Sequence, residues 1–283
     1  MFDAVRIDHE RLARSTGRLG IVFRRRGPAT ALVRREESGC LRVRLPRPGA
    51  GAPPLAVTLN NAGGLAGGDE LAIKAAWEEG TCAAISSAAA ERVYRARGVD
   101  GPARIRTRID VARDAEAEWL PQETILFDGA RLDRVTRIVL ADRSARFLGV
   151  ESVVYGRLSR GEAIRSGAFS DRIVVERAGR AVLVDPTRLV GDIAALLDRP
   201  AVAGGGRAVA SLIAADPDPE RLLEPVRAAF ERSGDDVEAG ASAWDGILFA
   251  RIVARDGLAL RRALVAALST LRGGRALPRV WHC

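Results

Sequence analysis

Alternation of apolar and polar side chains dominates the first two-thirds of the chain. The clearest case is the run RIRTRIDV at 104–111, in which Ile105, Thr107, Ile109 and Val111 share one face and charged side chains form the other. A period of two places one face of a β-strand on a core and the other in water. The pattern therefore predicts a strand that borders a core on one side.

The same period recurs along most of the chain up to residue 187. Further strands are expected at 18–24, 29–35, 41–45, 55–60, 71–77, 82–87, 115–120, 122–127, 133–140, 146–154, 164–176 and 181–185. Asp128-Gly129 separates two of these runs, and glycine tolerates the positive φ that tight turns need. The dipeptide therefore predicts a hairpin turn.

After Asp185-Pro186 the spacing of apolar residues becomes that of helices. Helices are expected over 189–198, 220–231 and 258–272, the last ending at Gly273-Gly274, and one or two late strands over 244–253. Glycine just after a helical run is a typical stop signal. We predict a single strand-rich domain over 1–283, with strands over 1–187 and a mixture of helix and strand over 188–283.

Composition narrows the class of protein. The 283 residues carry a formal charge of +8, 47% are hydrophobic, and Lys74 is the one lysine among 44 basic residues. Arginine richness of this kind reflects base composition, and with 5% scattered aromatics it does not favour nucleic-acid binding. A chain of this length buries a core without disulfides. No apolar stretch predicts a membrane span or a secretory signal, so we expect a cytoplasmic protein.

The number and spacing of the histidines and cysteines argue against several kinds of metal site and catalytic site. Cys40, Cys82 and Cys283 are far apart and form no CxxC pair, which argues against a disulfide framework or a zinc cage. His9 and His282 are the two histidines, so multi-histidine metal centres are impossible and a Ser-His-Asp site has no motif. The tail Trp281-His282-Cys283 offers one nitrogen and one sulfur to a soft metal, although a frayed terminus is the simpler interpretation.

Two segments match nucleotide-binding motifs only in part. Asn60-Asn61-Ala62-Gly63 matches a tetrapeptide of short-chain dehydrogenases, but neither Tyr94 nor Tyr155 is followed by the lysine that such enzymes need. The glycine run at 63–69 lacks both the GK[ST] ending of a Walker loop and the G-x-G-x-x-G frame. The sequence therefore predicts no nucleotide site.

Carboxylates are the remaining candidates for chemistry. Asp69, Glu123, Asp128 and Glu151 each lie at the edge of an expected strand. Hard oxygen ligands bind divalent cations and exchange them readily unless the site is preorganised. In a chain with so many arginines, ordinary salt bridges and turns are the alternative interpretation.

Three ordered blocks resemble one family. NNAGGLAGGDEL at 60–71 resembles the HPPGG-x-x-GGD-x-L signature of the UreD (UreH) urease accessory proteins, and WLPQETILFDGA at 119–130 resembles their WLPQETI-x-FDGA block. FLGVE at 147–151 and LPRVW at 277–281 are similar to two further family segments. The matched positions with a structural role are Gly63, Gly64, Gly67, Gly68, Trp119, Pro121, Gln122 and Gly129.

The first block departs from the family pattern. The family's His-Pro-Pro is Asn60-Asn61-Ala62 here, which removes an imidazole that could bind metal. The Thr-rich, Lys-containing stretch that follows in the family becomes 82–95, in which Ser86, Ser87, Tyr94 and Arg95 keep its character. A nickel contact assigned to the family's first motif is therefore in doubt for this chain.

The resemblance implies a mainly β fold, either β-helix-like or of layered β-sheets, with a few C-terminal helices. It implies no cofactor and no reaction, transient passage of nickel without a tight site, and binding to UreF, to UreG and to apo-urease. The polar groups expected along the nickel path are Asp69, Ser86, Ser87, Glu123, Asp128 and Glu151. A file of weak oxygen ligands suits passage, because a tight site would trap the ion.

Two alternatives stay open at this stage. One is a β-helix hydrolase of polysaccharides that uses Glu123 and Asp128 as an acid/base pair, and the other is a plain protein-binding module. A docking protein exposes apolar surface, so we also expect self-association of the isolated chain. The expected partner face is the set of helices over 189–198, 220–231 and 258–272.

Overall fold

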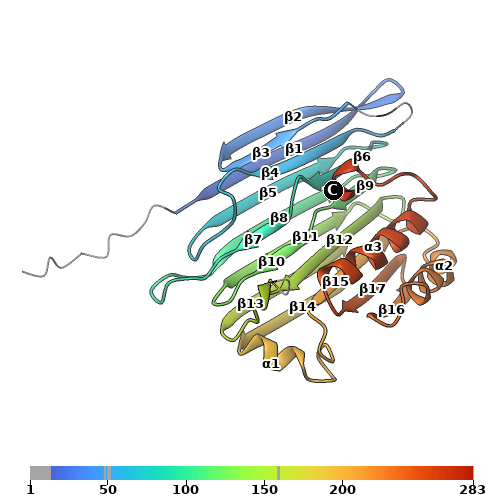
Figure 1. Cartoon of the computed structure of the whole chain (residues 1–283). Helices are drawn as coiled ribbons and strands as arrows, with labels where there is room; N and C mark the ends of the chain where they lie inside the picture. The colour runs from blue at the N-terminus through green and yellow to red at the C-terminus, as the bar shows by residue number, and fades with distance from the viewer. Residues whose placement is uncertain (1–13, 48, 50–51, 158–159, 283) are drawn as a thin grey trace, which may run out of the picture.

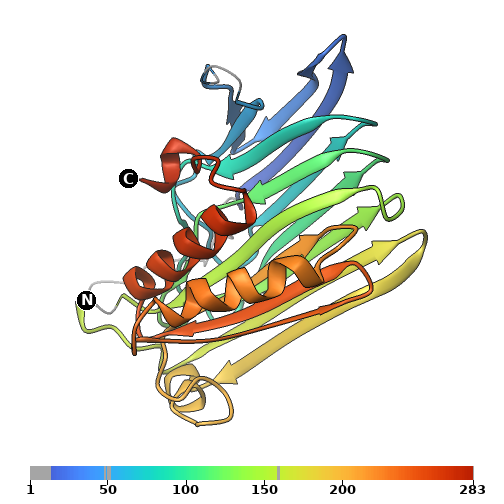
Figure 2. The same cartoon turned by 90° about the vertical axis from the view of Figure 1, so that its right-hand side faces the viewer.

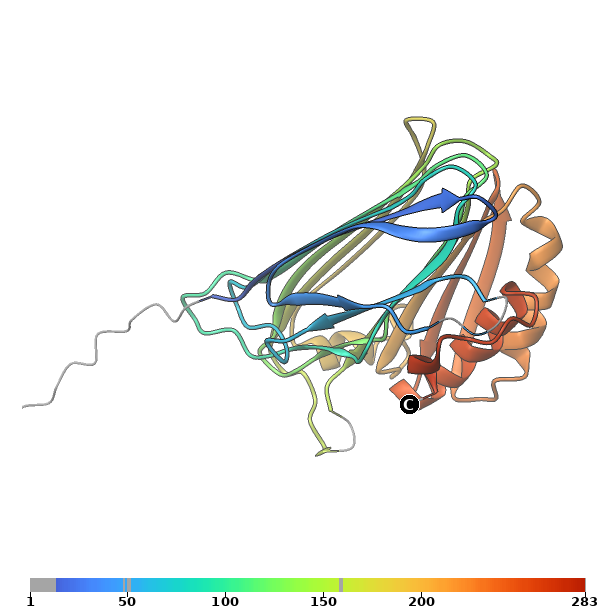
Figure 3. The same cartoon turned by 90° about the horizontal axis from the view of Figure 1, so that it is seen from above.

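Two β-sheets face each other, and helices cover the outer side of one of them (Figures 1 and 3). The computed structural model describes residues 14–47, 49, 52–157 and 160–282, and every statement on the structure refers to these. The protein is mainly β with a few helices, as predicted.

The first sheet has seven strands in the described part of the chain. Their order is β14-β13-β11-β8-β5-β1-β2. The bounds are β1 (Thr16–Arg26), β2 (Ala29–Gly39), β5 (Glu70–Trp77), β8 (Ala103–Val111), β11 (Arg131–Leu140), β13 (Gly167–Arg177) and β14 (Arg180–Gly191).

The second sheet has ten strands within the same residues. Eight follow the order β16-β17-β15-β12-β9-β6-β4-β3, and two short strands, β7 and β10, pair beside β12. The bounds are β3 (Leu41–Arg44), β4 (Leu55–Asn60), β6 (Cys82–Ser87), β7 (Glu91–Val93), β9 (Glu116–Leu120), β10 (Thr124–Leu126), β12 (Arg146–Tyr155), β15 (Ala208–Ala215), β16 (Val237–Trp244) and β17 (Ile247–Ala254).

The chain coils between the two sheets from β4 to β13. It alternates from one sheet to the other, so that β5, β8, β11 and β13 pair in parallel in the seven-stranded sheet. Likewise β4, β6, β9 and β12 pair in parallel in the ten-stranded sheet. Both expected descriptions therefore hold, because the layers are made by a flattened, β-helix-like coil.

Apolar side chains fill the space between the sheets. Phe23, Trp77, Ile109 and Ile138 are all less than 3% exposed in this layer. The predicted alternation at 104–111 is confirmed, since its apolar face is buried there. Burial of such side chains stabilises each by about 1.5–3 kcal/mol relative to exposure.

A second apolar layer lies between the ten-stranded sheet and two helices. Helices α2 (Glu220–Glu231) and α3 (Gly257–Leu271) pack on its outer face (Figures 2 and 3). Leu260 and Leu264 of α3 belong to this layer. Both helices lie where the apolar spacing predicted them, and Gly273, at φ 61°, follows the end of α3 as expected.

The turn at Asp128-Gly129 was wrongly predicted as a hairpin. β10 lies in the ten-stranded sheet and β11 in the seven-stranded sheet, so this turn carries the chain from one sheet to the other. Gly129 has the positive φ expected of a turn, at 77°. A tight turn requires the same backbone freedom whether its flanking strands pair or cross.

The first predicted helix was also misplaced. Residues up to Gly191 belong to β14, and α1 (Ile193–Leu197) is only five residues long. Pro186 does not end the strand, because β14 is at the edge of its sheet, where a missing backbone N–H is tolerated. The late strand is confirmed as β17, whereas β16 shares only Trp244 with the predicted range, and β15 and β7 were not predicted.

Candidate functional site

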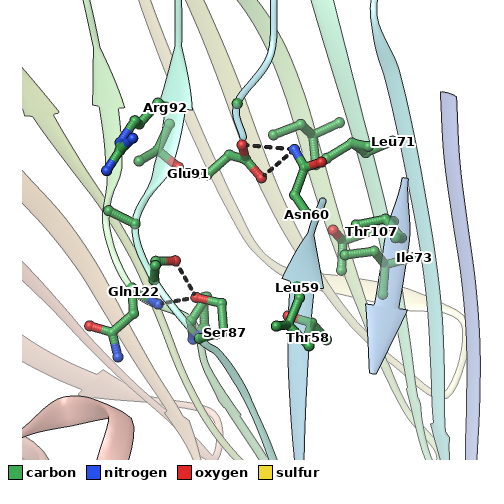
Figure 4. Close-up of a pocket in the computed structure, with 18 of the residues that line it drawn as sticks. Thr58, Leu59, Asn60, Leu71, Ile73, Ser87, Glu91, Arg92, Thr107 and Gln122 are labelled. Carbon is green, nitrogen blue, oxygen red and sulfur yellow. Dashed lines mark hydrogen bonds between the residues drawn. The ribbon is translucent and has the colours of Figure 1, made fainter. Parts of the chain in front are cut away.

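A cavity of about 300 Å³ opens between the two sheets (Figure 4). Its walls come from β5, β8 and β11 on one side and from β4, β9 and β12 on the other. The loop residues 61, 63–64, 88–90 and 121–122, together with Ser87 at the end of β6 and the start of β7, complete its lining. The cavity is largely apolar but carries hydroxyl, amide and charged groups from its rim to its inner end.

Asn60 and Glu91 face each other at the rim (Figure 4). The Nδ2 of Asn60 donates to both carboxylate oxygens of Glu91, at 3.0 and 3.2 Å. Burial raises the pKa of Glu91 to about 7, against the opposing effect of the bond from Asn60. Asn60 stands where the resembling family has histidine, so this chain replaces an imidazole with an amide bound to a carboxylate.

Arg134 lies at the inner end of the cavity and joins the two sheets. Its side chain is 4% exposed, and its Nη1 lies 2.8 Å from the Oε2 of Glu151 on the opposite sheet. Its Nε and Nη2 donate to both oxygens of Asp171, at 2.9 and 2.6 Å. Nη1 also donates to the hydroxyl of Thr124, at 3.2 Å.

Glu151 is held by further donors. Its Oε1 accepts from the indole N–H of Trp119 at 3.0 Å and from the hydroxyl of Thr136 at 3.2 Å. Burial nevertheless raises its pKa, against the opposing charge of Arg134. Burial acts to lower the pKa of Arg134, but Asp171 and Glu151 raise it overall, so the guanidinium stays charged.

A second polar cluster crosses the space between the sheets. Asp185 on β14 accepts from the hydroxyl of Ser211 at 2.8 Å and pairs with Arg251 on β17. The ring of Tyr155 lies edge-on to that of Phe169, 5.9 Å away, and burial raises the pKa of Tyr155. Polar groups thus also join the two sheets outside the lining of the cavity.

Several positions expected from the sequence line the cavity. They are Ser87, Glu151, Gly63, Gly64, Trp119, Pro121 and Gln122. The hydroxyl of Ser87 accepts from the backbone N–H of Gln122 at 2.8 Å and donates to the carbonyl of Ala89 at 3.1 Å. Of the six groups expected along an ion path, the structure therefore brings Ser87 and Glu151 to one cavity.

The other expected carboxylates and hydroxyl hold loops or strands. The carboxylate of Asp69 accepts from the backbone N–H groups of Ser15 and Ala66, at 2.8 and 2.7 Å. Ser86 is buried and donates to the carbonyl of Leu120 at 2.5 Å. The Oε2 of Glu123 lies 3.6 Å from a guanidinium nitrogen of Arg261.

Asp128 holds the turn between the two sheets. One of its oxygens accepts from the backbone N–H groups of Arg165 and Ser166, at 2.9 and 3.0 Å, and the other pairs with Arg95. Although burial acts to raise it, the pKa of Asp128 is lowered by these backbone bonds and by Arg95. That direction is opposite to what a general acid needs.

Glycine is required at two points of the first motif. A Cβ on Gly64, whose φ is 144°, would lie 2.5 Å from the ring of Tyr94. One on Gly67 would lie 2.8 Å from the Cβ of Ala96, so the two segments approach too closely for a side chain. Gly68 and Gly129 also have positive φ, at 84° and 77°.

Metal-binding residues do not cluster in the described residues. No group of three or more His, Cys, Asp or Glu side chains there could hold a metal ion. Burial raises the pKa of Cys40 and of Cys82, so both thiols are protonated and poor metal ligands at neutral pH. His9 and Cys283 lie outside the described residues.

The charged pair of Arg134 and Asp171 at the inner end of the cavity was not predicted from the sequence. Arg134 and Asp171 are direct partners on the adjacent parallel strands β11 and β13. Each occupies a position that alternation assigns to the buried face, among Leu132 and Ile138 on one strand and Phe169 and Ile173 on the other. The sequence did contain one indication of this pair, namely two oppositely charged residues at strand positions where alternation predicts burial.

Comparison with known proteins identifies one family. The family model for the UreD urease accessory protein matches residues 15–282. A urease accessory protein UreD from Methylobacterium sp. (strain 4-46) is 44% identical over 280 residues, which cover 96% of each chain. The UreD protein of Xanthobacter autotrophicus (strain ATCC BAA-1158 / Py2) is 44% identical over 268 residues, which cover 95% of this chain and 90% of the relative. In the described part of the present chain, no helix is long and apolar enough to cross a membrane.

Proposed function

Since the chain belongs to the family of UreD urease accessory proteins, we propose that it guides nickel towards apo-urease through the space between its sheets. Membership of the family supports a role in urease maturation. In the finer role proposed here the chain transforms no substrate, and nickel is its transient cargo in the cytoplasm.

The polar cavity between the sheets is the observation that carries this proposal. It runs from Asn60 and Glu91 at the rim to Glu151 and Arg134 at the inner end. Oxygen donors along such a path bind a divalent ion weakly.

The partners proposed are UreF, UreG and apo-urease. An apolar groove of about 580 Å³ lies on the surface between residues 44–47, 49 and 52–59 on one side and the segment Leu277–Val280 on the other. Large apolar side chains elsewhere on the described surface, such as Val99, Val190 and Leu258, are scattered. The groove supports the proposal of protein docking, and it also supports the expected self-association of the isolated chain.

Nickel content of urease tests the proposal directly. Urease is purified from a host strain that lacks this chain and from the same strain complemented with it, and bound nickel is measured per active site. We expect nearly empty sites without the chain and restored occupancy with it. Fully loaded urease in the deletion strain would contradict the proposal.

Copurification separates delivery from simple binding. A tagged copy of this chain should retain UreF and UreG from lysate of its own host, whereas a plain binding module would retain an unrelated protein instead. A variant with a blocked cavity, Thr107→Trp, should keep these partners but lose nickel loading of urease, because Thr107 points into the cavity from β8 (Figure 4). Thr107→Val, which keeps the size of the side chain, is the matched control.

A further inference from the structure

One buried arginine is shared by two buried carboxylates at the inner end of the cavity. The side chains of Arg134, Glu151 and Asp171 are 4%, 10% and 11% exposed. Different edges of the guanidinium meet the two carboxylates, with nitrogen–oxygen distances of 2.6–2.9 Å. The cluster therefore holds one positive charge against two acidic groups.

The oxygen atoms around this guanidinium resemble the donor set of a divalent cation. Two carboxylates from facing strands converge on one positive group, and the hydroxyl of Thr124 lies 3.2 Å from the same guanidinium. Hard divalent cations take carboxylate and other oxygen ligands of this kind. The guanidinium occupies the place that such an ion would take.

A small ion in the cavity would reach this point. Arg134 and Glu151 both line the cavity that opens at Asn60 and Glu91. The cluster is therefore not sealed inside the protein, in contrast to an ordinary core salt bridge. The space beside Arg134 also means that shortening this side chain would leave room for an ion and its water.

We propose that Arg134 is a built-in counter-cation that prevents Glu151 and Asp171 from holding a divalent metal ion. The inference deepens the proposed function and rests on it, because it concerns metal that travels through the cavity. Without Arg134 the two carboxylates would form a metal site at the inner end of the path. With Arg134 in place, an ion is not captured there and the path stays free.

A purely structural role of Arg134 makes a different prediction. If the guanidinium only joins the two sheets, its removal weakens the fold and metal ions do not restore the loss. If it occupies a latent metal site, its removal creates nickel binding that also stabilises the folded state, because a ligand that binds only the native state favours it. Metal-dependent stability therefore separates the two roles.

The test uses the purified full chain and nickel chloride. Arg134→Met is compared with the wild type by equilibrium dialysis and by thermal unfolding at several nickel concentrations. We expect about one nickel ion per chain, bound at least about tenfold more tightly than by the wild type, and a Tm that rises with nickel. Magnesium chloride in place of nickel shows how far the site selects between the two ions.

Two variants control for the loss of a buried arginine. Arg272→Met removes another buried guanidinium, which pairs with Glu118 as the one carboxylate, and should gain no nickel binding. The triple variant Arg134→Met, Glu151→Gln, Asp171→Asn removes the proposed ligands together with the counter-ion, and should bind no more nickel than the wild type. The proposal is overturned if Arg134→Met gains no nickel affinity or if the triple variant gains as much.

A folding defect in Arg134→Met would not prevent the test. If the variant is insoluble, it is produced with and without nickel chloride in the medium, and nickel must then increase the folded yield; an unchanged yield overturns the proposal. Failure here is distinguishable from failure of the proposed function. The nickel binding of the purified chain reports on Arg134, whereas the nickel content of urease in the deletion strain reports on delivery.

Discussion

Two buried arginines of this protein, Arg134 and Arg272, lie in clusters of different charge balance. Between the sheets, Arg134 forms ion pairs with two carboxylates, those of Glu151 and Asp171. Beyond the end of helix α3, the single carboxylate of Glu118 meets two arginines, Arg272 at 2.9 Å and Arg275 at 3.3 Å. The first cluster has an excess of acidic groups, whereas the second is balanced, because Arg275 also lies 3.9 Å from the carboxylate of Glu116.

The difference teaches what each cluster can do. Arg272 also donates to the carbonyls of Arg275 and Ala276, so it fastens the segment that follows α3 onto the ten-stranded sheet. That arrangement is balanced in charge and complete without a ligand. The Arg134 cluster borders a cavity, and its single guanidinium faces two carboxylates. Burial of charge therefore fastens a chain segment in one layer, whereas in the other layer it places an excess of carboxylates beside a cavity.

The largest expected effect is the loss of Arg134. Arg134→Met leaves two buried carboxylates without a counter-ion, and breaking a buried pair in this way typically costs about 3–5 kcal/mol. Urea unfolding in metal-free buffer should show a loss of this size. A loss below about 1 kcal/mol would mean that the cluster is far more hydrated than its burial indicates.

The rim should respond to pH. The pKa of Glu91 is about 7 in the folded protein and near 4.5 when unfolded, so the folded state retains the proton longer as pH rises. Stability from this group therefore falls between about pH 4.5 and 7, by about 3 kcal/mol in all. Glu91→Gln should be more stable than the wild type by about that amount at pH 8 and equal to it near pH 4.5. Parallel pH profiles for the two proteins would contradict the raised pKa.

Loss of Arg272 should cost less than loss of Arg134. In Arg272→Met, Glu118 keeps Arg275 as a partner, and removing a bond to a charged group costs about 1.5–3 kcal/mol. Urea unfolding of both single variants under identical conditions gives the ranking. If Arg272→Met proved the more damaging change, the contrast in charge balance would not explain the stability of the two clusters.

The smallest expected effect is at Glu123. Its carboxylate is 31% exposed and lies 3.6 Å from Arg261, and such surface pairs contribute about 0–1 kcal/mol. Glu123→Gln should unfold at nearly the wild-type urea concentration and should still support nickel loading of urease. A strong loss of loading would place Glu123 on the path of the ion. Unchanged loading would show that Glu123 is not needed on that path.

The sequence predicted strands well but not their pairing. Alternation at 104–111 identified β8 because its two faces meet different surroundings. β15 was missed because both of its faces are buried, one towards the seven-stranded sheet and the other under the helices. Apolar and polar residues therefore do not alternate along this strand. At Asp128-Gly129, turn chemistry indicated a reversal of direction, but which strand accepts the hydrogen bonds depends on residues distant in the chain.

The site was predictable only in part. Motif resemblance pointed to Glu151 and Gln122, and both line the cavity. Arg134 and Asp171 lie in no recognised motif, and a charged residue in a strand is normally assigned to solvent. Alternation along each strand shows that both residues face the core, but their contact depends on the parallel pairing of β11 with β13. The rest of the site therefore required the fold.

Gln122 links the cavity wall to a segment 158 positions later. Its Nε2 donates to the carbonyl of Val280 at 3.0 Å, and its Oε1 accepts from Arg261 at 2.7 Å. Nearby, the indole of Trp281 donates to the carbonyl of Leu120, which also accepts from Ser86. During synthesis on the ribosome, this wall therefore stays unsupported until residues 261–281 have emerged. A nascent chain cannot form the finished cavity until this late segment is available to hold its wall in place.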